Sequence, residues 1–231
     1  MVVCYPSWGD VTTARWAITE WQGLTNRDGT GVLNEVVDLA FSHAGVRVER
    51  EYMPWKRALY QVATGGADMA GGLEVSTEYY QATLPVSLIE ESVLYRLGEI
   101  PTWKGAKSLA GKIGVWPLGY LEEVPITVKN FMKGQGIQDR QRAIDMVLIG
   151  RADYYFDNKM QLEQAFAATQ QTYNPERFTI QTVHVIELYM SFTKNKNGKK
   201  LRELYDIGIQ KALKNGELNK VYKKWKQKRP F

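Results

Sequence analysis

Aromatic side chains are the groups in this sequence best suited to holding a small molecule. Tyr5 and Trp8 lie at the end of an expected first strand over residues 2–5, and Trp55 directly follows Pro54 after another expected strand. Loops that follow strands in α/β sheets often bind ligands, and aromatic rings stack on flat groups and on cations. We therefore predict Tyr5, Trp8 and Trp55 as walls of a binding site, with a place in the ordinary core as the alternative for each.

Residues that could perform catalysis are few. The two histidines, His43 and His184, have no obvious nucleophile or metal partner in the sequence, and Cys4 is the only cysteine. A Gly-x-Ser-x-Gly motif, a phosphate-cradling glycine loop with lysine and a His-Glu-x-x-His motif are all absent from the sequence. The sequence therefore predicts a binding protein without enzymatic activity, cofactor or metal.

The composition indicates a globular protein. Its 231 residues, 44% hydrophobic and 24% charged, suffice for two lobes of the common domain size, about 100 residues each. No apolar run approaches the roughly 18 residues that would span a bilayer. The net charge of +5 comes from interspersed charges of both signs until the last helix, so we expect no nucleic-acid partner. The basic end, residues 220–229, is interpreted as the polar face of a helix, with membrane or nucleic-acid contact as the alternative.

The first part of the chain alternates strands and helices. After the strand at residues 2–5 and an aromatic-rich stretch, Asn26 to Gly29 form a turn. The spacing then predicts two helices, over residues 31–44 and from Pro54 to Val62, and two strands, over residues 46–52 and 67–73. This β-α-β-α-β order favours a parallel sheet flanked by helices.

The pattern restarts near residue 112, which implies a second lobe. Here we expect a strand over residues 112–116, a helix over about 121–133, a helix carrying Ala143 to Leu148, and a strand over residues 152–156. The tail, residues 199–226, is expected to be helical throughout.

Several of these segments together resemble the bacterial extracellular solute-binding proteins, family 3, which serve amino-acid-type ABC transporters. Each motif is weak alone, but their order and spacing are jointly specific and cover nearly the whole chain. The matching segments are Asp28-Gly29-Thr30-Gly31, Pro54-Trp55-Lys56-Arg57-Ala58-Leu59, Gly65-Gly66-Ala67-Asp68, residues 71–78, Leu109-Ala110-Gly111-Lys112-Ile113-Gly114-Val115, Gly150-Arg151-Ala152-Asp153 and Asn215-Gly216-Glu217-Leu218.

The resemblance implies an α/β, two-lobed type II periplasmic-binding-protein fold. Lobe one would comprise residues 1–96 and 189–231, with lobe two, residues 97–188, inserted between two hinge crossings. In such proteins the ligand lies in the cleft between the lobes and favours the closed state, because both lobes contact it.

The resemblance also implies ligand residues in lobe one. The backbone around Leu73 and Val75 would line the cleft, and Glu74 between them could meet a cationic or hydroxylated ligand. Tyr80 stands where the family's Thr-x-x-Arg motif has an arginine that binds the ligand carboxylate. A phenol supplies no positive charge, so Tyr80 points away from a simple α-amino acid, unless another cation compensates. The candidates for that role are Lys56, Arg57 and Arg96, for each of which a solvated surface position is the alternative.

In lobe two, Gly119 and Tyr120 replace part of the family's Gly-Thr-Thr at a helix N-terminus, a place suited to anions. Asp157 or Asn158 stands where the family often has an acid that receives the ligand ammonium. We predict Asp157 for this role, with capping of the following helix as the alternative.

These features predict a protein that captures a small polar, aromatic or amine-containing solute for an ABC transporter. Its expected partner is a membrane permease, and it is expected to be a monomer. We expect it in the periplasm, with a leader peptide removed. Two alternatives use the same fold: the ligand-sensing module of a receptor, or an enzyme like cyclohexadienyl dehydratase with Glu74 or Glu187 as the acid.

Overall fold

The computed structural model describes residues 11–122, 124–169 and 174–231, which form two compact units. Unit 1 comprises the chain up to Leu88 together with Glu187–Phe231, and unit 2 comprises Ile89–Ile186. The chain leaves unit 1 within strand β5 (Ser87–Arg96) and returns within strand β9 (Phe178–Phe192). The predicted strand at residues 2–5, and with it Cys4, Tyr5 and Trp8, lies outside the described residues.

Unit 1 contains a sheet in the strand order β2-β1-β3-β9. Strands β2 and β3 both pair in parallel with β1, whereas β9 runs antiparallel to β3. The short strand β4 also pairs with β9. The three parallel strands therefore end at the same edge of the sheet. The bounds of these strands are β1 Thr13–Ile18, β2 Arg47–Tyr52, β3 Met69–Leu73 and β4 Tyr80–Gln81.

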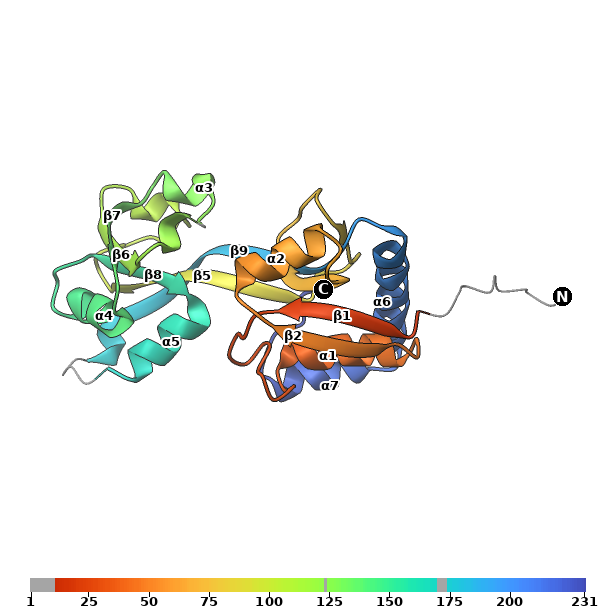
Figure 1. Cartoon of the computed structure of the whole chain (residues 1–231). Coiled ribbons are helices and arrows are strands. Elements are labelled where there is room, and N and C mark those ends of the chain that lie inside the picture. Colours follow the sequence, from red (N-terminus) through yellow and green to blue (C-terminus); the bar gives the residue numbers. More distant parts are fainter. Residues whose placement is uncertain (1–10, 123, 170–173) are drawn as a thin grey trace. The chain divides into compact units, whose positions relative to one another are not determined.

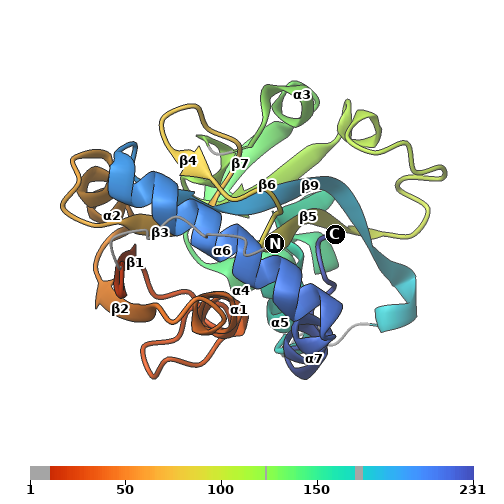
Figure 2. The same ribbon diagram turned by 90° about the vertical axis from the view of Figure 1, so that its right-hand side faces the viewer.

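Helices cover both faces of this sheet. Alternate residues of β1, Ala14, Trp16 and Ile18, join the larger core cluster with helices α1, α6 and α7, while Ala17 joins a smaller cluster with helix α2. Figure 1 shows α1 and α7 side by side, and Figure 2 shows α6 running across the unit. The helices are α1 Val32–Ser42, α2 Trp55–Ala63, α6 Lys196–Lys214 and α7 Glu217–Lys224.

A glycine allows α6 to pack closely against α1. A Cβ atom at Gly208 would lie 1.9 Å from the carbonyl oxygen of Ala40, a distance that real side chains do not tolerate. The sequence at this position therefore sets how deeply α6 can pack into the core of unit 1.

Two predictions for unit 1 need correction. The aromatic-rich stretch contains strand β1, which buries Trp16. It was not predicted because Trp16, Ala17 and Ile18 are all buried, so the strand lacks a regular alternation of apolar and polar residues. The tail is not one helix: Gly216 has a φ of 73° and separates α6 from α7. A left-handed residue cannot continue a right-handed helix, which is why glycine ends it. The turn at residues 26–29 and the elements over α1, β2, α2 and β3 agree with prediction.

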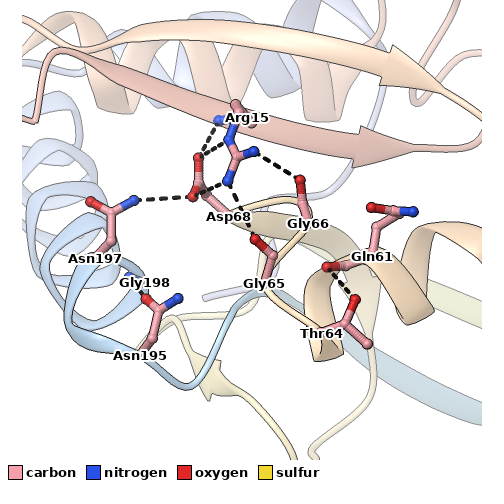
Figure 3. Close-up of polar contacts among 9 residues, drawn as sticks. All are labelled: Arg15, Gln61, Thr64, Gly65, Gly66, Asp68, Asn195, Asn197 and Gly198. Carbon is pink, nitrogen blue, oxygen red and sulfur yellow. Dashed lines mark hydrogen bonds and ion pairs between the residues drawn. The ribbon is translucent and has the colours of Figure 1, made fainter.

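The Gly-Gly-Ala-Asp segment joins three elements of unit 1 (Figure 3). The buried Asp68 carboxylate accepts hydrogen bonds from the Arg15 backbone (2.9 Å), the Arg15 guanidinium (3.1 Å) and the Asn197 amide (3.0 Å). Arg15 also donates to the carbonyl of Gly66 in the turn before β3. Asp68 thus ties the start of α6 to strand β1.

Unit 2 contains a second sheet in the strand order β5-β8-β6-β7. Strands β7 and β8 are both parallel to β6, and β5 is antiparallel to β8. Alternate residues of the sheet build two cores, one with Tyr154 and Phe156 and one with Tyr155. The elements of this unit are β6 Ile113–Pro117, β7 Lys133–Ile137, β8 Tyr154–Asn158, α3 Ile126–Lys129, α4 Arg140–Leu148 and α5 Lys159–Ala167, with short 3-10 turns at Lys107–Leu109, Tyr120–Glu122 and Pro175–Arg177.

The predicted helix over residues 121–133 is wrong. The structure has a 3-10 turn, the short helix α3 and then strand β7 in this region. Pro125 explains the break, because proline lacks an N–H and fits only at the start of a helix, where it caps α3. The strand before it and helix α4 agree with prediction, and β8 begins two residues later than the predicted start at 152.

The first boundary between the units lies earlier than the predicted one at residues 96–97. Residues Glu91 to Tyr95 of β5 pair with β8, so this part of the strand belongs to the sheet of unit 2. The second boundary, between 186 and 187, lies near the predicted one at 188–189.

Candidate ligand-binding site

In unit 1, the loops that follow the three parallel strands lie at one edge of the sheet. They are residues 19–21 after β1, 53–55 after β2 and 74–76 after β3. Ligands of open α/β sheets bind at this carboxyl edge. Four of the predicted residues lie in these loops or next to them: Trp55, Leu73, Glu74 and Val75. Trp55 follows β2 and the other three lie at the end of β3, so they share one edge of the sheet.

Trp55 and Leu73 pack against the same small core. Both are half-buried against the cluster that contains Met53, Ala58 and Tyr79. Trp55 is the first residue of α2, with Pro54 before it at the N-cap. This packing fixes the indole at the start of the helix and leaves part of it accessible.

The loop after β3 is held by two side chains that the sequence did not indicate. Gln81 accepts a hydrogen bond from the Ser76 N–H (2.8 Å) and donates to the carbonyl of Glu74 (2.8 Å). Lys194 donates to the carbonyl of Thr77. Glu74 and Val75 remain exposed, with Val75 79% accessible. The Ser76 N–H is thus already used inside the protein.

Tyr80 packs against the large core of unit 1. Its strand, β4, pairs Tyr80 with Phe192 and Gln81 with Ser191. Successive strand residues point to opposite faces, and Gln81 reaches the loop after β3. Tyr80, half-buried against the large core, therefore lies on the other face. A ligand contact by Tyr80 stays a prediction.

In unit 2, three parallel strands likewise end at one edge. Gly119 and Tyr120 follow β6, Arg140 begins α4 after β7, and Asp157 lies at the end of β8. Gly119 is exposed, whereas Tyr120 packs against the core with its ring centroid 6.0 Å from that of Phe156.

Asp157 is the centre of a buried charged network. Its side chain is fully buried and accepts hydrogen bonds from Arg140 Nε (2.8 Å), the Tyr155 hydroxyl and the Asn158 N–H (2.7 Å). Burial, reinforced by the Asp157 carboxylate, raises the pKa of Tyr155, so the phenol stays protonated and donates. Burial works against protonation of Arg140, but the hydrogen bond and charge of Asp157 outweigh it and raise the pKa of the guanidinium.

The alternative role predicted for Asp157 was to cap the next helix, and the structure gives this role to the neighbouring residue. Asn158 is the N-cap of α5 and accepts a hydrogen bond from the Met160 N–H (3.0 Å). Asp157 instead holds Arg140, whose side chain remains 46% exposed. Whether Asp157 also meets a ligand stays a prediction.

Sequence reasoning did not identify Thr19 to Trp21, Gln81 or Arg140. The loop after β1 escaped because the first strand was placed at residues 2–5. In it, Thr25 accepts from the Trp21 N–H (3.0 Å) and donates to the Thr19 carbonyl (2.8 Å). Arg140 could have been suspected from its place directly after a strand. Gln81 gave no signal, because a glutamine in a short strand has no distinctive spacing.

Of the cations predicted to replace the family's arginine, Arg96 is engaged elsewhere. Its guanidinium donates to the carbonyls of Val147 (3.4 Å) and Leu148 (2.9 Å) at the end of α4. Lys56 and Arg57 are exposed in the first turn of α2.

Within residues 11–122, 124–169 and 174–231, no three His, Cys, Asp or Glu side chains gather closely enough to hold a metal ion. No helix in the same part of the chain has the length and apolar character needed to cross a bilayer.

Known proteins resemble the chain in fold and in family pattern. Among solved structures, YckB of Bacillus subtilis has a TM-score of 0.71 at 19% identity, covering 93% of this chain and 89% of its own. The probable amino-acid ABC transporter extracellular-binding protein ytmK of the same organism has a TM-score of 0.68 at 16% identity, covering 94% and 98%.

A third structure is the ancestral amino acid-binding protein AncCDT-1, described as a precursor of cyclohexadienyl dehydratase. It has a TM-score of 0.63 at 18% identity, covering 93% of this chain and 95% of its own. These likenesses establish the type II periplasmic binding fold. No curated protein matches the sequence. Residues 13–228 match the family model of bacterial extracellular solute-binding proteins, family 3, so the chain belongs to that family.

Proposed function

We propose that this protein captures an amino-acid-type solute outside the cytoplasm, in the periplasm, and delivers it to the membrane permease of an ABC transporter. Membership of the solute-binding family supports the binding role. The relatives described as amino-acid-binding support the class of solute. In this role the protein works as a monomer, and it needs no cofactor because it leaves the ligand unchanged.

The observation that carries this proposal is the gathering of binding groups at the carboxyl edge of each unit. Unit 1 brings Trp55 and Glu74 to its edge, and unit 2 brings Tyr120 and Arg140 to its own. Each edge by itself offers groups that can bind part of an amino acid: an aromatic ring and a carboxylate in unit 1, and an aromatic ring and a guanidinium in unit 2.

Thermal unfolding against a library of amino acids, amines, organic acids, peptides and sugars tests the function. A ligand at 100 times its Kd stabilises the protein by about 2.7 kcal/mol, which is measurable as a rise in Tm. We expect α-amino acids to give the largest rise. A rise with sugars alone, or with no compound, would contradict the proposal.

A pair of tryptophan variants tests the edge of unit 1. Trp55→Ala should reduce the ligand-induced rise in Tm, because it removes the predicted wall. Trp103→Ala is the matched control, since Trp103 stacks on Tyr95 (5.8 Å between ring centroids) in unit 2 and lies at neither edge. An equal loss of ligand response in both variants would remove Trp55 from the site.

A dehydratase on this fold is the second candidate, supported by the description of AncCDT-1. A carboxylic acid catalyst usually needs an apolar pocket that raises its pKa. Glu74 is exposed in unit 1, and Glu187 accepts a hydrogen bond from Tyr189 (2.7 Å), which favours binding over catalysis. Turnover of prephenate or arogenate by the purified protein would reverse this choice. A receptor module would show the same ligand response, so a permease pull-down distinguishes it.

A further inference from the structure

We infer that Arg140 in unit 2 binds the carboxylate of the ligand. This inference rests on the function proposed above. It assigns the anion-binding charge to a helix start that follows β7, and not to the Thr-x-x-Arg position of the family, where this chain has Tyr80.

The first step is the missing charge at the family position. Tyr80 is half-buried against the large core of unit 1, and its phenol brings no positive charge. Lys194, the cation that reaches the neighbouring loop, donates to the Thr77 carbonyl. In unit 2, Lys159 pairs with Glu90 (2.7 Å), and Arg96 donates to the end of α4. The candidate cations that remain are Lys56 and Arg57, exposed in the first turn of α2, and Arg140 of unit 2. Of these three, Arg140 is the one held in place by a buried acid.

The second step is the geometry of Arg140. A guanidinium carries five N–H donors in a rigid plane, and the contact with Asp157 uses the Nε side of it. The side chain is 46% exposed, so part of it is accessible to a second carboxylate, to which its remaining N–H groups can donate. Because Asp157 and Tyr155 fix the inner side, the guanidinium is already oriented before a ligand arrives.

The third step concerns Asp157. The resemblance predicted this acid as the receptor of the ligand ammonium, but it is fully buried and already accepts from Arg140, Tyr155 and Asn158. A ligand ammonium would have to displace one of these donors. Asp157 acts instead as a positioning residue for Arg140.

Binding of the twenty L-amino acids and of their amides, measured by the rise in Tm and by calorimetry, tests this assignment. An amide keeps the amine but lacks the carboxylate. In the wild type, the best-binding amino acid should have an affinity about 100-fold higher than that of its amide. This is the usual loss of affinity when one partner of a desolvated charge pair is removed. In Arg140→Gln this preference should fall to a few-fold, while the affinity for the amide barely changes.

Three variants separate this role from a structural one. Arg142→Gln is the matched control, because Arg142 is exposed on the same helix, and it should keep the full preference. Should Arg140→Gln fail to fold, Arg140→Gln with Asp157→Asn avoids the unpaired buried acid and should fold without the preference. Asp157→Asn alone should keep part of the preference, because Arg140 remains.

The outcomes distinguish the two proposals. If no amino acid stabilises the wild type, the proposed function fails. If amino acids bind but Arg140→Gln discriminates against the amide as the wild type does, the function stands and the assignment of Arg140 is overturned. Loss of amide binding together with amino-acid binding would also overturn it, since it would show a merely structural effect.

Discussion

A Gly-x-x-Asp motif, residues 65–68 in unit 1 and residues 150–153 in unit 2, makes the same backbone contacts in both units. Gly65 and Gly150 end a helix with φ angles of 79° and 77°. In unit 1, the Arg15 N–H donates to Asp68 (2.9 Å), and the Asp68 N–H donates back to the Arg15 carbonyl (2.9 Å). In unit 2, Ile113 and Asp153 make the same pair of bonds, both at 2.7 Å.

The difference between the motifs lies in their other partners. Asp68 also binds the Arg15 guanidinium and the Asn197 amide, and it is buried, whereas Asp153 is half-buried. Asn197 belongs to α6, which enters unit 1 only after the chain has passed through unit 2. Unit 1 is built from two distant chain segments, so its motif also ties the second segment to the first. Unit 2 is continuous and needs no such tie.

Replacing Asp68 should produce the largest effect. Asp68→Ala leaves the partly buried Arg15 N–H without its acceptor and removes the ion pair with Arg15 and the hydrogen bond from Asn197. We expect the free energy of unfolding of unit 1 to fall by about 3 kcal/mol. Urea unfolding combined with hydrogen exchange of peptides from β1 and α6 measures it. If both peptides of Asp68→Ala exchanged as slowly as in the wild type, Asp68 would not stabilise the contact between β1 and α6.

Asp153→Ala is the counterpart in unit 2 and should cost less. It removes one hydrogen bond to the Ile113 N–H, and Asp153 is not fully buried, so water can replace it in part. We expect a loss of about 1 kcal/mol, seen as faster exchange in β6 but not in β1. A loss as large as that of Asp68→Ala would mean that the shared backbone pair, and not the extra partners of Asp68, dominates.

How far the sequence predicts this molecule depends on how local each signal is. Helices α1, α2 and α4 agreed with prediction because their apolar spacing and the glycines or prolines at their ends lie within one short segment. Strand β1 was missed because a strand in the middle of a sheet is defined by its neighbours, and Arg15 has a partner 53 residues away in Asp68.

The candidate site shows the same limit. Trp55, Glu74, Gly119 and Asp157 could be proposed because motif spacing carried them from the family pattern. The contact between Arg140 and Asp157 joins residues 17 positions apart across a helix start and a strand end. No periodicity encodes such a pairing, so the position of Arg140 beside Asp157 becomes visible only in the fold.

Asn197→Ala should have the smallest effect, and it tests the hydrogen bond between α6 and Asp68 by itself. It removes one bond to Asp68 at the partly buried start of α6 and leaves both backbone bonds and the Arg15 ion pair in place. We expect a loss of about 0.5–1 kcal/mol, with faster exchange confined to the first turns of α6. In a double-mutant cycle with Asp68→Ala, the two losses should not add, because each removes the same bond. If they do add, Asn197 stabilises α6 by some route other than Asp68, and the two motifs would differ only in the contribution of Arg15.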